Sequence, residues 1–178
     1  MSYPTSWGRW SLQMVAAMLL WLTIAGPALA ADRRTIRSEN RVLLAEARAF
    51  FAAGENDSAL ARLDAVLVTD PANPDAYYFK GLIYLSVADT SAATESLGVG
   101  VEKAPLSRRL KLLLARVQVE AGEVDGAEQL AQEVVALRPF DPDAAYVLGL
   151  VALARSDTLA ALDIWETVLI EKQKGGQQ

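Results

Sequence analysis

The stretch Pro74–Pro105, PDAYYFKGLIYLSVADTSAATESLGVGVEKAP, sets the pattern for most of the chain. It opens with Pro-Asp, which suits the first turn of a helix because proline loses no needed donor there and aspartate complements the helix dipole. A turn at Ala88-Asp89 separates this helix from a second one, which Pro105 cannot continue. The stretch therefore predicts two helices joined by a tight turn.

The same arrangement recurs along the chain at a fixed step, the equal spacing of Pro71, Pro105 and Pro139. Small residues recur at that step in both helices of each pair, and antiparallel helices can approach closely only where side chains are small. They are Ala47, Gly81, Ala115 and Gly149 in the first helices, and Ala59, Ala93, Ala127 and Ala161 in the second. Helix pairs that repeat in this way predict a stack of hairpins.

Larger residues follow in the second helices at Leu63, Leu97 and Trp165, and Ala131 departs from this series. Because small and large residues recur at the same positions of each repeat, the chain resembles the tetratricopeptide-repeat (TPR) family over about residues 40 to 173. The resemblance implies an all-α fold, a right-handed α-solenoid of about four TPR helix-turn-helix hairpins. The implied units are 40–73, 74–107, 108–141 and 142–173, after a polar lead-in at 31–39 and before a flexible tail at 174–178.

Three local features predict how the repeats are capped and packed. Asn56–Ser58 offers side chains that can cap the free amide groups of a second helix. Gly98 and Gly100 lie inside another second helix, where glycine costs about 1 kcal/mol relative to alanine, so this helix either lies unusually close to a neighbour or is the softest of the stack. An apolar stripe on the last helix either packs inward or is covered by a partner: Leu162, Trp165 and Leu169.

The segment 1–30 has the layout of a secretory signal peptide. Leu12–Gly26 is an uncharged, mostly apolar run, Pro27 breaks it, and Ala28–Ala30 is a small-x-small cleavage site. Together with the excess of arginine over lysine, this predicts a bacterial protein exported to the periplasm. The alternative is an uncleaved anchor in the inner membrane with the repeats facing the periplasm, because the whole uncharged run Ser11–Ala31 is just long enough to span a bilayer.

The composition argues against an enzyme, a metal site and a nucleic-acid partner. The chain has no histidine and no cysteine, which removes the usual neutral-pH proton carrier and the common zinc ligands. Gly98-Val99-Gly100 lacks the third glycine and the preceding strand of a phosphate-binding loop. Removal of the segment 1–30 takes away only Arg9, which leaves 16 of the 17 basic residues against 22 acidic ones. This negative net charge argues against binding to a polyanion such as nucleic acid. We expect a non-enzyme without cofactors.

The resemblance implies that the first helix of each hairpin lines a concave, partner-binding face. The implied positions follow i, i+3, i+7 and i+10, so they share one helix face. They are Arg41, Leu44, Arg48 and Phe51 in unit one, Asp75, Tyr78, Leu82 and Leu85 in unit two, Arg109, Leu112, Arg116 and Val119 in unit three, and Asp143, Tyr146, Leu150 and Leu153 in unit four. Alternatively, the apolar members of this set pack between hairpins.

Such a face suits an extended or helical peptide with apolar anchors and acidic groups, and Tyr78, Tyr146 and the arginines are the expected anchors. The lysine and asparagine set that clamps a C-terminal carboxylate in chaperone-binding members of the family is absent. The leading hypothesis is therefore a periplasmic scaffold that binds a protein or peptide segment during assembly of an envelope complex.

Two alternatives to this hypothesis follow from the C-terminal repeat. Ala160–Leu169 resembles the last repeats of helical modules in cytochrome c maturation, which implies a membrane-anchored module of such a pathway. A structural protein that self-associates through the end around Trp165 is the other alternative.

Overall fold

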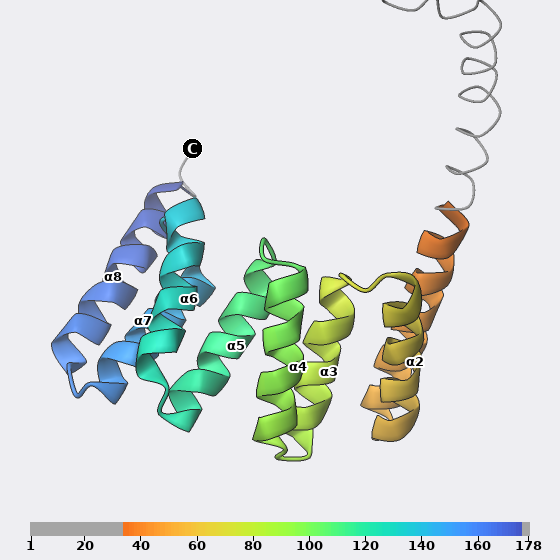
Figure 1. Ribbon diagram of the computed structural model, residues 1–178. Coiled ribbons are helices and arrows are strands. Elements are labelled where there is room, and N and C mark those ends of the chain that lie inside the picture. Colours follow the sequence, from red (N-terminus) through yellow and green to blue (C-terminus); the bar gives the residue numbers. More distant parts are fainter. Residues whose placement is uncertain (1–33, 176–178) are drawn as a thin grey trace, which may run out of the picture. The chain divides into compact units, whose positions relative to one another are not determined.

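The fold is a series of helical hairpins, shown in Figure 1. The computed structural model describes residues 34–175, and in that range the chain holds helices and short turns but no strand. The chain divides into two compact units, Met1–Val42 and Leu43–Gln178, and the packing below is that of the second unit. The helices are 34–52, α2 (Asn56–Thr69), α3 (Pro74–Ser86), α4 (Thr90–Lys103), α5 (Arg108–Ala121), α6 (Val124–Leu137), α7 (Pro142–Ala154) and α8 (Thr158–Gly175).

The hairpins are joined by a repeated set of helix contacts. Within hairpins, α3 packs on α4, α5 on α6 and α7 on α8, while between hairpins α2 packs on α3, α4 on α5 and α6 on α7. The first helices also contact one another, α3 with α5 and α5 with α7, whereas the described second helices α4, α6 and α8 do not. Because the first helices approach one another more closely, the inner side of this unit is formed by α3, α5 and α7. The expected all-α solenoid of helix-turn-helix hairpins is confirmed.

Glycine lies opposite the largest residues of the second helices. A Cβ atom at Gly81 would lie 2.6 Å from Leu97 Cδ2, and one at Gly149 would collide with the indole of Trp165. In the third hairpin, Ala115 and Ala131 are both completely buried in one cluster. In the second and fourth hairpins a glycine thus makes room for the large residue that faces it, whereas in the third hairpin Ala131, which departs from the series of large residues, shares a cluster with Ala115.

The two glycines inside α4 differ in their surroundings. Gly100 is buried, and a Cβ atom there would lie 2.6 Å from Tyr77 Cβ and 3.2 Å from Leu110 Cδ1. Gly98 has no such neighbour within 4 Å. The expected close approach is confirmed at Gly100 alone, since nothing around Gly98 requires a glycine.

The core consists of apolar clusters between consecutive hairpins. One cluster joins residues 43–51 to α2 and α3 through Ala47, Leu63 and Ile83. Two more follow along the unit, centred on Leu97, Leu110 and Val117 and on Ala131, Val134 and Val147. Since every cluster draws residues from more than one hairpin, no hairpin buries its apolar surface alone.

The four turns within hairpins share one backbone conformation, and side chains cap several of the helices. Gly54 and Gly122 take positive φ values at two turns, and Ala88 and Ser156 adopt φ values of 58° and 63° at the equivalent places. The side chains that cap helices are Asn73, Asp89, Asp141 and Asp157.

The expected cap of α2 at Asn56–Ser58 is wrong. Glu55 precedes the helix, no side-chain cap forms, and Ser58 Oγ instead donates to Glu55 Oε2 at 3.4 Å. The helix begins one residue too early for Asn56 to act as its cap, because Asn56 is already the first helical residue.

The ends of the described region extend beyond the expected limits. The first described helix already includes residues 34–39 of the expected lead-in, and α8 runs to Gly175, into the expected tail. The leader and its cleavage or anchoring lie outside the described residues. None of the described helices is both long and apolar enough to cross a bilayer.

The apolar stripe of α8 does not pack inward as a whole. Trp165 turns toward α7, where its Nε1 donates to Ala145 O at 3.1 Å. Leu162 and Leu169 remain 54% and 61% exposed. The inward interpretation is therefore right for Trp165 and wrong for the two leucines.

Candidate functional site

A pocket of ≈ 250 Å³ opens on the inner side of the second unit. Only the first helices α3, α5 and α7 line it, so it occupies the face where the resemblance places a partner. Its lining residues are Tyr78, Arg108, Arg109, Leu112, Leu113, Arg116, Asp143, Tyr146 and Val147. The pocket has an apolar floor, since Leu112, Leu113 and Val147 are buried, and a rim of arginines and tyrosines.

Arg109 is held on the α3 side of the pocket by two contacts. Its guanidinium lies 4.1 Å from the centre of the Tyr78 ring, a cation–π geometry. Its Nη1 also donates to Asp75 Oδ1 at 2.9 Å. Both partners come from α3, so these contacts link the first helices of neighbouring hairpins and leave the charge of Arg109 already compensated.

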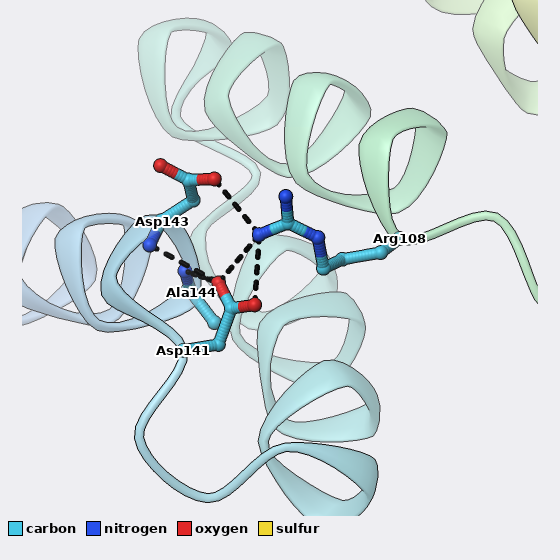
Figure 2. Close-up of polar contacts among 4 residues, drawn as sticks. All are labelled: Arg108, Asp141, Asp143 and Ala144. Atoms are coloured by element: carbon cyan, nitrogen blue, oxygen red, sulfur yellow. Dashed lines mark hydrogen bonds and ion pairs between the residues drawn. The ribbon is translucent and has the colours of Figure 1, made fainter. Parts of the chain in front are cut away.

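Arg108 forms ion pairs on the α7 side of the pocket, as Figure 2 shows. Its Nη1 donates to both Asp141 carboxylate oxygens at 2.8 and 2.7 Å, and to Asp143 Oδ2 at 2.8 Å. Asp141 is buried and also accepts from the backbone N–H groups of Asp143 and Ala144, which caps α7. Burial of Arg108 opposes its charge, but the hydrogen bonds to Asp143 and Asp141 outweigh burial and raise its pKa above the ordinary value.

Arg116 is the pocket arginine without a compensating charge. It lies seven residues after Arg109 on the same face of α5, and its side chain is exposed. Within the described residues no carboxylate forms an ion pair with it, whereas Arg108 and Arg109 are both paired. Arg116 can therefore accept an incoming anionic group without first breaking an internal ion pair.

Tyr146 closes the α7 side of the pocket. Its side chain is exposed, and its ring stacks on Trp165 with 6.4 Å between centroids and an interplanar angle of 20°. Because the indole supports one face of the ring, Tyr146 offers a rigid aromatic surface at low entropic cost.

The structure brings together six of the residues expected on the concave face. Arg48 lies elsewhere, with its guanidinium 4.7 Å from the centre of the Phe79 ring. Arg41 is exposed and belongs to the unit Met1–Val42. The residues brought together at the pocket are Tyr78, Arg109, Leu112, Arg116, Asp143 and Tyr146.

Most apolar members of the expected set pack into the core, which is the second of the two alternatives that the sequence leaves open. Of these apolar members only Tyr146 and Leu153 are exposed, while Leu150 is half-buried and Leu112 is only 6% exposed. The others pack against the core clusters, and on α3, α5 and α7 this follows because each of these helices contacts its own second helix, the preceding hairpin and a neighbouring first helix. These core-packed members are Leu44, Phe51, Tyr78, Leu82, Leu85 and Val119.

Sequence reasoning missed Arg108, which shapes the pocket as much as its neighbour Arg109. The signal was present in the repeat register. Arg108-Arg109 opens unit three, while the neighbouring units open with Pro74-Asp75 and Pro142-Asp143. A basic pair between acidic openings predicts ion pairs between successive first helices, which the structure shows for both arginines.

The described residues around this site include no histidine and no cysteine, because the chain has neither. Among the described residues no group of three or more acidic side chains could hold a metal ion. The arrangement suits recognition of a ligand by charge and aromatic contact.

Comparison with known proteins agrees with the fold. A family model described as Tetratricopeptide repeat matches residues 44–97 and 101–176. The tetratricopeptide repeat and J domain-containing co-chaperone DNJ1 of Fusarium oxysporum f. sp. lycopersici is 34% identical over 86 residues, which are 48% of this chain. The chain spans only 16% of the length of that relative.

Solved structures share the fold at low identity. A crystal structure of MamA has a TM-score of 0.66 at 17% identity, covering 94% of this chain and 98% of that one. MamA 41-end from Desulfovibrio magneticus RS-1 has a TM-score of 0.63 at 21% identity, covering 87% and 94%. The first TPR of Spaghetti (RPAP3), bound to the HSP90 peptide SRMEEVD, has a TM-score of 0.59 at 17% identity, covering 67% and 94%.

Proposed function

Since the chain belongs to the tetratricopeptide-repeat family, whose model matches residues 44–97 and 101–176, we propose that it is a scaffold that holds a protein or peptide segment in the pocket of α3, α5 and α7. TPR proteins serve as protein-interaction scaffolds, and a structural neighbour was solved with a peptide bound. We further propose that the chain performs no catalysis, in keeping with this fold and with the absence of histidine and cysteine.

The uncompensated charge of Arg116 beside the tyrosines carries the proposal. A bound segment places an acidic group on Arg116 and an apolar side chain against the exposed ring of Tyr146. A charge-assisted hydrogen bond to arginine is stronger than a neutral one, and a supported aromatic ring buries apolar area with little loss of freedom. The segment is therefore one that combines an acidic residue with an apolar neighbour.

The proposed location is the periplasm, and the proposed role is assembly of an envelope complex. Support comes from the sequence of residues 1–30, with its apolar run and Ala28–Ala30 motif. The competing proposal is an inner-membrane anchor that presents the same pocket to the periplasm, as in a pathway like cytochrome c maturation. Mass spectrometry of the chain purified from its native envelope separates the two, because cleavage removes residues 1–30 and anchoring retains them.

The binding proposal is tested with peptides selected on the intact chain. A display library of random peptides is enriched on the wild type, and the affinity of a selected peptide is then measured for Arg116→Gln. We expect the selected peptides to contain an acidic residue, and Arg116→Gln to lose at least about tenfold in affinity, or about 1.4 kcal/mol.

Arg138→Gln is the matched control for this test. Arg138 is also exposed and has no ion pair among the described side chains, but it follows α6, outside the pocket. Its substitution should leave the affinity unchanged. Equal affinities for the wild type and Arg116→Gln would reject the proposed site.

A further inference from the structure

The outer face of α8 is the most apolar exposed helix surface in the described structure. Leu159 is 80% exposed, and Leu162, Leu169 and Ile170 are exposed on the same side of the helix. Four large apolar side chains on one helix of an otherwise packed solenoid mark a surface that a further element covers.

The repeat register shows what kind of contact α8 lacks. Whole repeat steps relate Leu169 to Leu67, Val101 and Val135. Leu67 and Val101 pack on the cluster around Leu110, and Val135 packs on the cluster that contains Val147. These positions thus pack against the first helix of a following hairpin, whereas Leu169 is 61% exposed, with no such helix among the described residues to cover it.

A groove lies beside this apolar ridge of four exposed side chains on α8, at the position where a further helix would pack. It measures ≈ 290 Å³ and is lined by Pro142, Ala145, Tyr146, Trp165, Val168 and Leu169. One repeat earlier, the equivalent residues Leu112, Ala131 and Val134 cluster with Ala144 and Val147 of α7. The groove therefore fits a helix that presents apolar side chains along one face.

The helix α8 of a second copy has that apolar face and the charges to match. Its exposed charges are acidic in the first half, at Asp163 and Glu166, and basic in the last turn, at Lys172 and Lys174, although Lys174 also pairs with Glu171 of its own helix at 2.6 Å. When two such helices pack antiparallel, the basic turn of one lies over the acidic half of the other. A parallel pair would place like charges together.

Head-to-tail stacking fits the surface less well. In the helix over 34–52, Val42 is the only large apolar side chain among the described residues that is strongly exposed. That helix offers no apolar ridge to match the groove on α8. A two-fold pair, in contrast, gives each copy both a ridge and a groove, as an isologous interface requires.

From these observations we infer that two copies of this chain pair through α8, packed antiparallel about a two-fold axis. The two sites adjoin at Tyr146 but can be altered independently, because Arg116 lies outside the α8 groove and Leu162 lies outside the peptide pocket. Tyr146 borders both sites, so it is left unaltered in the tests.

The first test is sedimentation equilibrium of the full chain over a range of concentrations. We expect the wild type to change from monomer to dimer, and the double variant Leu162→Glu, Leu169→Glu to raise the dimer Kd at least tenfold. The control double variant is Leu106→Glu, Leu137→Glu, which alters leucines that are 86% and 70% exposed away from α8. A wild type that stays monomeric, or a control that raises the Kd as much, would overturn the inference.

The second test measures orientation, and it uses the absence of cysteine from the chain. Spin labels are placed on Thr158→Cys or Lys174→Cys, at opposite ends of α8, and distances between copies are measured. These positions are separated by roughly 24 Å along a helix with a 1.5 Å rise per residue. Antiparallel pairing predicts a short distance from 158 to 174 and a much longer one from 158 to 158. The reverse order would mean parallel pairing, and no distance between copies would mean no pairing through α8, so either result contradicts the inference.

Discussion

At the scale of single residues, a few side chains decide how the hairpins are joined. Asp141 accepts hydrogen bonds from Arg108 and from two backbone amides of α7, with its side chain almost completely buried. Gly149 and Gly81 admit the large residues that face them. These positions combine a local role within one helix with a contact to another, so substitutions there act on more than one element.

Asp141→Ala should lower the free energy of unfolding by about 2–4 kcal/mol. The change removes the cap of α7 and leaves Arg108 without its main partner. Asp141→Asn keeps an oxygen that can cap the helix but loses the charge, so its loss should be smaller, about 1–2 kcal/mol. Urea unfolding of both variants tests the order, and a greater loss for Asn than for Ala would contradict this account of the network.

Two glycine-to-alanine substitutions should act in opposite directions. Gly149→Ala should destabilise by about 1–3 kcal/mol, because the new Cβ atom collides with the Trp165 indole. Gly98→Ala, inside α4 with open space around the new methyl group, should stabilise by about 0.5–1 kcal/mol. Urea midpoints compared at equal m-values test both signs, and stabilisation by Gly149→Ala would show that the helices can separate without cost.

At the scale of elements, charged pairs supplement the apolar packing between helices. Lys111 of α5 donates to Glu133 of α6 at 2.6 Å, and Arg155 joins Asp125 and Glu128. The hydrogen bond from Lys111 lowers the pKa of the Glu133 carboxyl below its ordinary value. These pairs lie at the edges of the helix contacts, where partial exposure keeps each contribution small.

The Glu133 pair predicts a small dependence of stability on pH. Because the folded pKa lies below the unfolded one, the pair stabilises the fold above the ordinary glutamate pKa of about 4.3, and its contribution is lost as pH falls through the folded pKa. Glu133→Gln should therefore cost less than about 1 kcal/mol at pH 7, after allowance for exposure, and less still at pH 3.

The matched control is Glu120→Gln, which alters an exposed carboxylate of α5 that has no ion pair in the described region. Chemical denaturation at both pH values measures the differences. A cost of Glu133→Gln that is larger at pH 3 than at pH 7 would contradict the assigned direction of the pKa shift.

The helices could be predicted from the sequence, whereas their contacts could be predicted only in part. The equal spacing of the prolines and the small residues at 81 and 149 predict the hairpins. Helix ends and close helix approaches can be recognised in this way because they depend on local sequence or recur at one repeat step. The exposure of Leu82 and Leu85 could not be predicted, since it depends on how closely the next first helix approaches. The pairing of Arg108 with α7 is different, because the basic pair Arg108-Arg109 between two acidic openings indicates it in the sequence.

At the scale of the whole molecule, the repeats present two different surfaces for binding. The inner face joins three first helices around the charge of Arg116 and the ring of Tyr146. The last described helix, α8, presents leucines where the earlier hairpins have a following neighbour. A scaffold that pairs through α8 and keeps its inner pockets free would present two peptide sites per dimer, which raises apparent affinity for a partner with repeated segments.

The most direct measurement of the central claim is the location of a bound peptide by NMR. Backbone amide shifts of the labelled chain are followed as a peptide selected on the wild type is added. Binding in the proposed pocket predicts the largest changes around Tyr78 and Arg116 and in the neighbouring first turn of α7. Changes confined to the outer helices α4 and α6, with α3, α5 and α7 unaffected, would contradict binding on the inner face.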